Sequence, residues 1–267
     1  MNTHHLGSTR LARAGLLLVL ATLLALAGLA PSSTPASAKD SGSGWLRLAH
    51  LSPDTPSVNV SLTSFGDSKT MVKLTDVGYG DVSKYQKVPS GRYVATMTPA
   101  GGTAQSTPSI TQAVTVADGR AYTVAAVGDN AHLRGTVLND DLRTPAAGSA
   151  KVRLLSAAVS SPTTTVTALG GPVLARDAAF GTSTGYATIK AGVWTVRIDP
   201  SMAAPVTADV TAQPGSVSTI VLLDGPSGTV TAKVVKDASA SPKAPKKGTG
   251  VNTGGGGTAT TFVGESR

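Results

Sequence analysis

The chain has 267 residues, a formal net charge of +8 at pH 7 and no cysteine. The absence of cysteine excludes disulfide bonds and thiolate metal sites, so burial of apolar side chains must stabilise the fold. Fourteen of the fifteen acidic residues are Asp, and Glu265 is the only Glu. Because Glu favours exposed helix positions and Asp favours turns, this composition, rich in Val, Thr, Gly and Ser, predicts an all-β protein with many turns.

Two arginines precede an apolar run over residues 14–30, and the small residues Ala36 and Ala38 follow it. This order is typical of a secretory signal peptide cleaved after Ala38. The run is 17 residues long, at the lower end of the ~17–25 that span a bilayer, so an uncleaved membrane anchor is the alternative. We expect a signal peptide over 1–38, a mature net charge of +6 (21 − 15), and a protein that is extracellular or loosely associated with the cell wall.

After a short flexible leader over 39–44, a first domain is expected over 45–141. Turn signals such as Ser52-Pro53-Asp54 and Pro89-Ser90-Gly91 separate short runs rich in β-forming residues, a spacing typical of a β-sandwich or barrel. Its strands are predicted at Trp45–Leu51, Val58–Leu62, Thr70–Leu74, Val82–Lys87, Arg92–Thr98, Ile110–Val116, Ala121–Val127 and Leu133–Leu138.

A linker over 142–149 and a second domain over 150–237 follow. The clearest strand of the second domain is Val193–Ile198, in which Trp194 and every second residue after it share an apolar face. Ala121–Val127 and Ser218–Leu223 are nearly continuous apolar runs, which is typical of central strands. The remaining Lys/Pro/Gly-rich residues, 238–267, are too polar to fold, and we expect a disordered tail.

The two domains are repeats of one unit. Gly80, Tyr85 and Gly91 recur as Gly181, Tyr186 and Gly192 with a constant offset (181 − 80 = 101). Outside this stretch, Leu46-Arg47-Leu48 corresponds to Val152-Arg153-Leu154, and Gly135-Thr136-Val137 corresponds to Gly228-Thr229-Val230. A period of this length predicts tandem domains rather than a solenoid. We therefore expect two tandem Ig-like or transthyretin-like antiparallel β-sandwich domains.

The first unit resembles a known family. It opens with His50-x-Ser52-Pro53-Asp54-x-Pro56-x-Val58-x-Val60 and continues through Val77-x-Tyr79-Gly80, Tyr85, Pro89-x-Gly91-x-Tyr93 and Ala121–Gly128. These motifs resemble domain-of-unknown-function family 4397, which implies secreted or surface-attached β-sandwich modules, often in tandem and common in actinobacteria. The resemblance is fainter in the second unit, where Leu155-Ser156-Ala157-Ala158 lacks the His and the Asp. The family implies no activity.

His50 and Asp54 flank a Ser-Pro turn and could bind a metal or act as a base with its orienting group. In the alternative interpretation, Ser52-Pro53-Asp54 is a strand-ending turn, Asp54 accepts backbone N–H groups and His50 belongs to the sheet. The second is favoured because the expected mature chain has one other His, His132, and no Cys, whereas zinc needs three or four N or S ligands. Asp129-Asn130 and Asn139-Asp140-Asp141 could donate oxygens to calcium, although solvated turns are the commoner use of such residues.

The sequence offers little sign of catalysis. Its Gly-x-Ser-x-Gly stretch, Gly181-Thr182-Ser183-Thr184-Gly185, lies in a domain that is expected to be all-β, whereas a nucleophile elbow joins a strand to a helix. There is no nucleotide-binding glycine pattern, and most Asp residues of the folded region lie in evident turns. A secreted hydrolase would need His50 or His132 in a cleft beside a Ser or Asp. We predict a protein that is not an enzyme and that uses no cofactor or metal.

The basic residues are not gathered with aromatic side chains, which argues against nucleic-acid binding. Lysines at 236, 243, 246 and 247 predict weak, salt-sensitive attraction to wall polyanions. The membrane is expected as a partner only if the signal segment stays uncleaved.

The expected role is a structural or binding module at the cell envelope, with cell-wall polymers or another surface protein as partners. We place the binding surface on loops at one end of the first domain, because binding residues gather on loops over a rigid scaffold. The alternative is a carbohydrate- or wall-polymer-binding module, which exposed aromatic residues on a sheet face would favour. The candidate binding residues are His50, Ser52, Pro53, Asp54, Pro56, Phe65 and Asp67.

Overall fold

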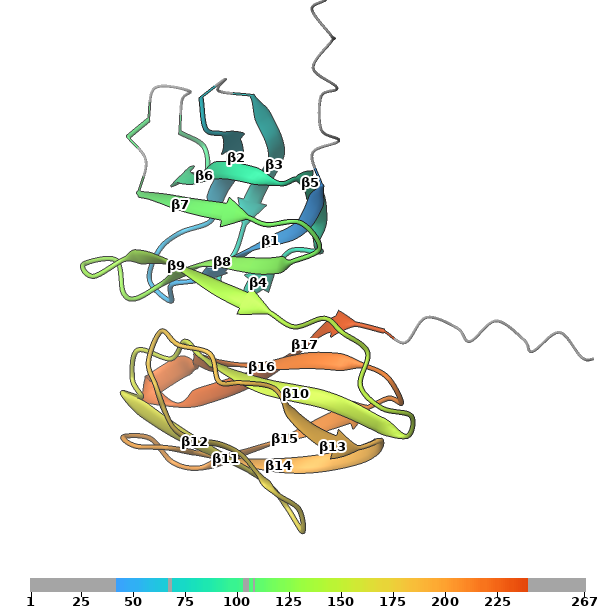
Figure 1. The fold of residues 1–267 in the computed structure, drawn as a ribbon. Helices are drawn as coiled ribbons and strands as arrows, with labels where there is room; N and C mark the ends of the chain where they lie inside the picture. The colour runs from blue at the N-terminus through green and yellow to red at the C-terminus, as the bar shows by residue number, and fades with distance from the viewer. Residues whose placement is uncertain (1–41, 67–68, 103–105, 108, 240–267) are drawn as a thin grey trace, which may run out of the picture. The chain divides into compact units, whose positions relative to one another are not determined.

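A computed structural model of the chain describes residues 42–66, 69–102, 106–107 and 109–239 (Figure 1). The predicted signal peptide, Asp67 and the predicted tail from residue 240 onward lie outside the described residues. The described part consists of β-strands and one turn of 3-10 helix at Pro226–Gly228. Among these residues no helix is long and apolar enough to cross a membrane. The prediction of an all-β fold is confirmed.

The first repeat comprises strands β1 to β9, which form two sheets. One sheet has the order β4-β1-β8-β9, with β5 also paired to β1, and the other has the order β3-β2-β6-β7. The strands are β1 Ser43–Leu51, β2 Val58–Ser64, β3 Thr70–Val77, β4 Asp81–Val82, β5 Gln86–Pro89, β6 Gly91–Pro99, β7 Ile110–Val116, β8 Ala121–Val127 and β9 Arg134–Asp140.

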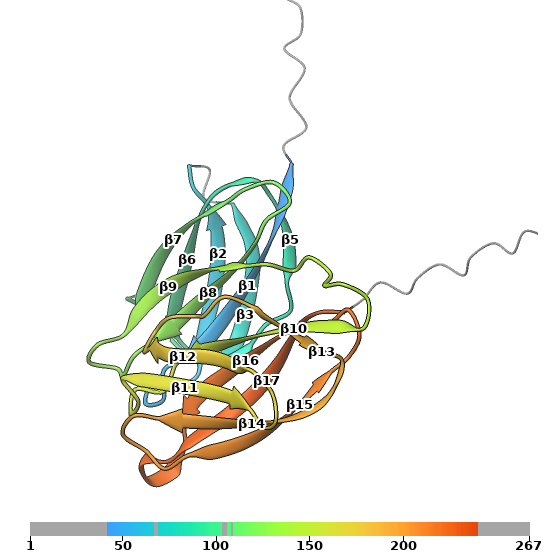
Figure 2. The same cartoon turned by 60° about the horizontal axis from the view of Figure 1, so that its bottom comes forward.

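The second repeat comprises β10 to β17 and repeats this topology, except that β4 has no counterpart strand. Its sheets have the orders β13-β10-β16-β17 and β12-β11-β14-β15 (Figure 2). The strands are β10 Ser149–Ser156, β11 Thr163–Ala168, β12 Val173–Ala179, β13 Ala187–Lys190, β14 Gly192–Pro200, β15 Val206–Ala212, β16 Val217–Asp224 and β17 Val230–Ala238. An isolated bridge, Leu155 to Ser183, stands where β4 would pair.

Several details of the sequence-based prediction need correction. The sheets are not antiparallel throughout, because β1 pairs with β8, and β10 with β16, in parallel. The predicted strand Val82–Lys87 is two short strands, β4 and β5, because residues 83–85 leave the ladder between them. β1 begins at Ser43, inside the predicted leader, and β10 begins at Ser149, inside the predicted linker.

The register of β9 and β17 also corrects one part of the predicted repeat alignment. Thr123 of β8 pairs with Leu138 of β9, and Thr219 of β16 pairs with Val235 of β17. Leu138 is therefore equivalent to Val235, so the Gly-Thr-Val match at 135–137 and 228–230 is coincidental. Composition alone produced that match, since Gly, Thr and Val are abundant throughout the chain.

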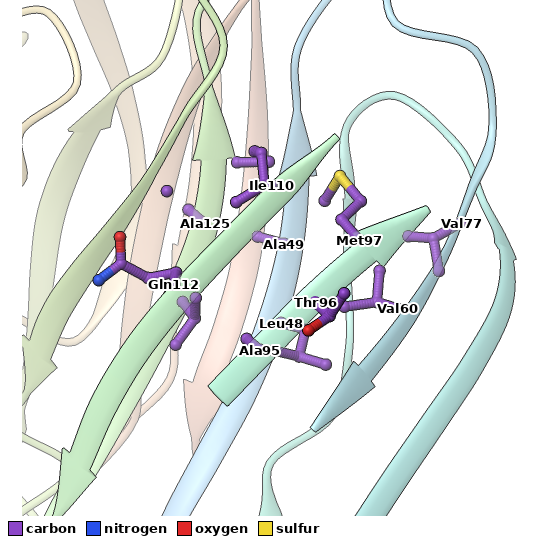
Figure 3. Close-up of a pocket in the computed structure, with 13 residues that line it drawn as sticks. Leu48, Ala49, Val60, Val77, Ala95, Thr96, Met97, Ile110, Gln112 and Ala125 are labelled. Atoms are coloured by element: carbon purple, nitrogen blue, oxygen red, sulfur yellow. The ribbon is translucent and has the colours of Figure 1, made fainter. Parts of the chain in front are cut away.

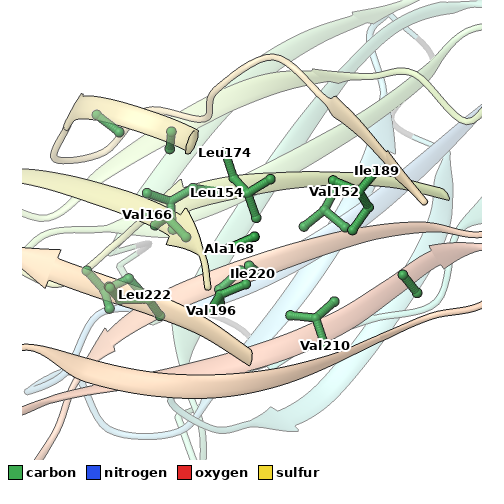
Figure 4. Packing of buried hydrophobic residues seen from close by; sticks show 14 of the residues in the cluster. Val152, Leu154, Val166, Ala168, Leu174, Ile189, Val196, Val210, Ile220 and Leu222 are labelled. Carbon is green, nitrogen blue, oxygen red and sulfur yellow. The ribbon is translucent and has the colours of Figure 1, made fainter. Parts of the chain in front are cut away.

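Each repeat has its own apolar core between its two sheets. In the second repeat, Val152 and Leu154 from one sheet meet Val166 and Val196 from the other (Figure 4). The predicted alternation along β14 is confirmed, because Val196 is fully buried whereas Val193 is 73% exposed. In the first repeat the corresponding cluster includes Leu46, Leu48, Val58, Leu62, Tyr93, Met97 and Val124.

Glycine is required at one equivalent position in each repeat. Gly80 has a φ of 81° and Gly181 a φ of 75°, in the left-handed region that side-chain-bearing residues rarely adopt. At Gly181 an added Cβ would also collide with the guanidinium of Arg134, which belongs to the first repeat. The glycine repeat noticed in the sequence therefore marks a turn and, at Gly181, a close approach between the repeats.

Candidate functional site

The structure buries the most prominent of the predicted site residues. The His50 side chain is 0% exposed, and its Nε2 lies 3.3 Å from the carbonyl oxygen of Thr55. Ser52 is also fully buried and shares a 2.7 Å hydrogen bond with the Thr55 hydroxyl. Burial lowers the pKa of His50, with the Thr55 backbone contact partly opposing the shift. Neither side chain can reach a ligand in solvent.

Asp54 has the structural role that the favoured alternative assigns to it. Its Oδ1 accepts a 2.7 Å hydrogen bond from the backbone N–H of Asn130, so it ties the β1–β2 loop to the β8–β9 loop. Pro53 is partly exposed and Pro56 is exposed beside it. A binding role for these exposed loop residues stays a prediction.

Phe65 lies apart from that loop. The Ser52–Pro56 segment precedes β2 and Phe65 follows it, so the two lie at opposite ends of the strand. The prediction of one loop cluster at one end of the domain is therefore wrong. Phe65 is exposed, with the guanidinium carbon of Arg92 4.2 Å from its ring centroid. This arrangement explains Phe65 as one half of a surface cation–π pair.

The first repeat gathers a buried arginine, threonine and aspartate and a partly buried tyrosine on the face that meets the second repeat. The Tyr85 and Thr123 hydroxyls donate to Asp140 Oδ2 at 2.8 and 2.6 Å. Arg47 Nε donates to Thr123 Oγ1 at 2.8 Å, and its guanidinium lies 4.6 Å from the Tyr85 ring centroid. Arg47 does not pair with Asp140, however. Its Nη1 donates to Oδ1 of Asp237, in the second repeat, at 2.8 Å.

The second repeat carries the equivalent residues with equivalent bonds. The Tyr186 and Thr219 hydroxyls donate to Asp237 Oδ2 at 2.7 and 2.6 Å. Arg153 Nε donates to Thr219 Oγ1 at 3.0 Å, and Arg153 Nη2 donates to Oδ1 of Asp140 in the first repeat. The two ion pairs between the repeats are therefore reciprocal. We call these eight residues the Arg–Asp network.

The four charged side chains of the Arg–Asp network are buried and their charges balance. The side chains of Arg153 and Asp140 are 1% and 0% exposed. Burial raises the pKa of the Tyr85 and Tyr186 hydroxyls, and the adjacent aspartates raise it further, so both stay neutral. Burial lowers the pKa of Arg153, but the attraction and hydrogen bond of Asp140, together with Tyr186 and Asp237, outweigh it and the net shift is upward. Because its four charged side chains are withdrawn from solvent and already paired with one another, the network has a structural role.

A groove of about 530 Å³ opens in the first repeat, where β1 and β8 begin and β9 ends. Trp45 is 40% exposed and lines it. The Trp45 backbone N–H donates to the carbonyl of Arg120 at 2.8 Å, which fixes the start of β1 beside β8. We call this the Trp45 groove, and its lining is Trp45, Gly119, Arg120, Ala121, Tyr122, Asn139, Asp140, Asp141, Leu142 and Arg143.

The polar side of the Trp45 groove is held in place by ion pairs. Arg143 Nε and Nη2 donate to the two carboxylate oxygens of Asp141 at 2.7 and 2.9 Å. Lys151 Nζ donates to Asp141 Oδ2 at 2.8 Å. The Arg143 hydrogen bonds, helped by Lys151, hold the pKa of Asp141 well below its usual range. The groove therefore combines an exposed indole with a carboxylate that stays charged.

The same place in the second repeat has lost its aromatic residues. Lys151 is equivalent to Trp45, since each lies two residues before its repeat's network arginine, and Ser218 is equivalent to Tyr122. A groove of about 310 Å³ opens here, lined by Asp209, Thr211, Gln213, Ser216, Ser218, Val234 and Lys236. The two repeats share a scaffold and differ in the chemistry of this end.

The first core contains a further small cavity, of about 20 Å³ (Figure 3). Leu48, Val60, Met97 and Ile110 are among its lining side chains, which are almost all apolar. That volume is about what one water molecule requires, and an apolar cavity of this size stays dry. It is a packing defect of the core and not a ligand site.

The residues considered for metals are engaged elsewhere. Asp140 belongs to the Arg–Asp network, and Asp141 pairs with Arg143 and Lys151. Asp129 accepts hydrogen bonds from the backbone N–H of His132 and lies 2.8 Å from its Nδ1. Within the described ranges, no group of three or more His, Cys, Asp or Glu side chains could hold a metal ion. His132 itself is exposed on the β8–β9 loop and does not line the Trp45 groove.

The family model described as Domain of unknown function (DUF4397) matches the chain twice, over residues 44–167 and 150–248. The chain belongs to the DUF4397 family. Both repeats carry a DUF4397 match, including the second, where the sequence resemblance was faint. No curated protein matches the chain.

Among solved structures, this DUF4397 chain is similar to the TIE protein of Bacillus anthracis, at 13% identity and a TM-score of 0.25, over 68% of this chain and 34% of that one. It is similar to CBMbc, a family CBM26 module of Eubacterium rectale Amy13K in complex with maltoheptaose, at 13% identity and a TM-score of 0.24. That match covers 73% of this chain and 98% of CBMbc. A leucine-rich repeat protein of Bacteroides thetaiotaomicron is similar at 12% identity and a TM-score of 0.21, and the match covers 67% of this chain and 26% of that protein. Scores this low identify neither a ligand nor a function.

Proposed function

We propose that the protein is a secreted, non-catalytic module of the cell envelope that binds glycan through the Trp45 groove. The observation that carries the proposal is the exposed indole of Trp45, 40% accessible in a groove of about 530 Å³. Among the aromatic side chains of the first repeat, Tyr93 is buried and Tyr85 belongs to the Arg–Asp network. Phe65 is exposed on a turn outside the groove.

The composition of the groove suits a sugar. A pyranose ring has an apolar face that packs on an indole, while its hydroxyls need donors and acceptors around the edge. The groove supplies the amide of Asn139, the carboxylate of Asp141 and the guanidinium groups of Arg120 and Arg143. The ion pairs that hold Asp141 in place reduce the entropy lost when it binds a ligand.

The sequence supports location at the envelope through its N-terminal signal-like segment and its lack of cysteine. The non-catalytic part of the proposal rests on the histidines. His50 is sealed in the first repeat, and His132 lies on an exposed loop away from the groove. A hydrolase built on either residue would need a cleft at that position.

The test is a pull-down of residues 39–267 on purified cell-wall sacculi, repeated at roughly 0.3 M salt, which shortens the Debye length below about 6 Å. Trp45→Ala is expected to weaken binding by about 30-fold, since a central Trp contributes about 2 kcal/mol or more to an interface. Phe65→Ala is the matched control, an exposed aromatic outside the groove, and should change binding less than twofold. Salt-resistant binding that is indifferent to Trp45→Ala would refute the proposed site.

A further inference from the structure

The contacts between the repeats have the reciprocity of a two-fold interface. Arg47 of the first repeat bonds Asp237 of the second, and Arg153 of the second bonds Asp140 of the first. Because Arg47 is equivalent to Arg153 and Asp140 to Asp237, the same surface appears on both sides. In a dimer, an interface is called isologous when residue i of one subunit contacts residue j of the other and residue j of the first contacts residue i of the second. Here one chain supplies both halves.

The apolar part of this interface has diverged so that each half fits the other and not itself. One cluster contains Ala49 and Ala125 from the first repeat together with Leu155 and Val221 from the second. These are equivalent positions, small in the first repeat and large in the second, whereas Leu51 of the first repeat corresponds to the smaller Ala157 of the second. Two identical repeats would therefore leave a gap where small side chains meet and overpack where large ones meet, each at a cost in free energy.

A polar contact adds to this selectivity. The Tyr79 hydroxyl accepts from the backbone N–H of Asp224 at 2.7 Å and lies 3.3 Å from its carbonyl oxygen. The residue equivalent to Tyr79 in the second repeat is Phe180, which has no hydroxyl. Phe180 instead lies under Arg134, with 5.1 Å between guanidinium carbon and ring centroid. The face of the first repeat thus recognises the second repeat specifically.

We infer that this face is a recognition surface whose partner is the complementary repeat, and that a second copy of this chain can supply that repeat, so two chains pair by exchanging repeats. Nothing in the reciprocal contacts requires both repeats to come from one chain. Residues 141–148 alone join β9 to β10. The exchanged dimer keeps all four charges of the Arg–Asp network paired, and therefore avoids the cost of a lone buried charge.

Two full-length variants with complementary charges test the inference. In Arg47→Asp, two carboxylates face each other within the chain, and in Asp237→Arg, two guanidinium groups do so. When the two variants are mixed, exchange of repeats restores every pair, because each altered residue meets its opposite charge in the partner. Native mass spectrometry of the mixture should show a heterodimer, with pairing at least tenfold tighter than either variant with itself.

Size-exclusion chromatography with light scattering should show the mass of two chains for the mixture only. If both variants are folded by circular dichroism and the mixture stays monomeric, the inference is overturned. If either variant fails to fold, wild-type chains decide the question. Tagged and untagged wild-type chains are unfolded and refolded together at high concentration. Co-purification of the untagged chain supports the inference, and its absence overturns it.

Discussion

Arg153→Met should destabilise the protein by about 3–5 kcal/mol. The Arg153 side chain is 1% exposed, and among the described residues it is the only cation that bonds the Asp140 carboxylate. The other partners of that carboxylate are the neutral hydroxyls of Tyr85 and Thr123. Methionine fills most of the volume but leaves a buried, uncompensated charge, and breaking a buried pair in this way typically costs about 3–5 kcal/mol. For a chain of this size, at about 2–4 °C per kcal/mol, that corresponds to a fall in Tm of roughly 6–20 °C.

The assay is urea unfolding followed by circular dichroism, with thermal unfolding as a second readout. Arg197→Met is the matched control, because Arg197 also pairs with an aspartate, Asp199, but the side chains are 51% and 36% exposed. An exposed pair contributes about 0.2–1 kcal/mol. Adding Asp140→Asn to Arg153→Met should recover part of the loss, since it removes the stranded charge. Equal losses for Arg153→Met and Arg197→Met would refute the reasoning.

Three further predictions concern stability. Burial lowers the pKa of His50 below its ordinary 6.5, so the unfolded chain binds the proton more readily and stability should fall as pH drops below about 6.5; between pH 7 and 5 the decline, followed by urea midpoints, should be shallower in His50→Gln, and an equally steep decline in that variant would contradict the assignment. On β14, Ile198→Ala should cost about 2–5 kcal/mol because Ile198 is fully buried, whereas Val193→Ala, at a 73% exposed position, should cost less than about 0.5 kcal/mol; similar urea midpoints for the two variants would contradict the assigned strand faces. Gly181→Ala should lower stability by about 1–2 kcal/mol or more, because its φ of 75° disfavours any Cβ; an unchanged Tm would show that this turn is not held as described.

Much of the fold could be predicted from the sequence because its signals are local. Alternation along Val193–Ile198 and turn residues such as Pro89-Ser90-Gly91 indicate strands and their ends without reference to distant parts of the chain. The duplication was readable from Gly80, Tyr85 and Gly91 and their counterparts, since the same turn needs the same residues in both repeats. The continuous apolar run of β8 indicated a strand covered on both faces.

The candidate site was less predictable. The sequence drew attention to His50 and Asp54 because those residue types carry chemistry, whereas burial and a loop contact explain both. Trp45 received no functional interpretation, because residue type alone does not show how much of an indole stays exposed. The matching arginines in Leu46-Arg47-Leu48 and Val152-Arg153-Leu154, and the recurrence of Tyr85 as Tyr186, were the available signals of the Arg–Asp network.

By itself, the sequence determined the strands, the turns and the two-fold repetition, all of which depend on residues close together along the chain. Only the tertiary structure decided that Arg47 pairs with Asp237 rather than with Asp140 of its own repeat. Alternation in a strand shows which side chains share a face, but not whether that face meets water or another sheet. That choice depends on the packing of segments about 190 residues apart, and it fixes both the interface and the groove beside it.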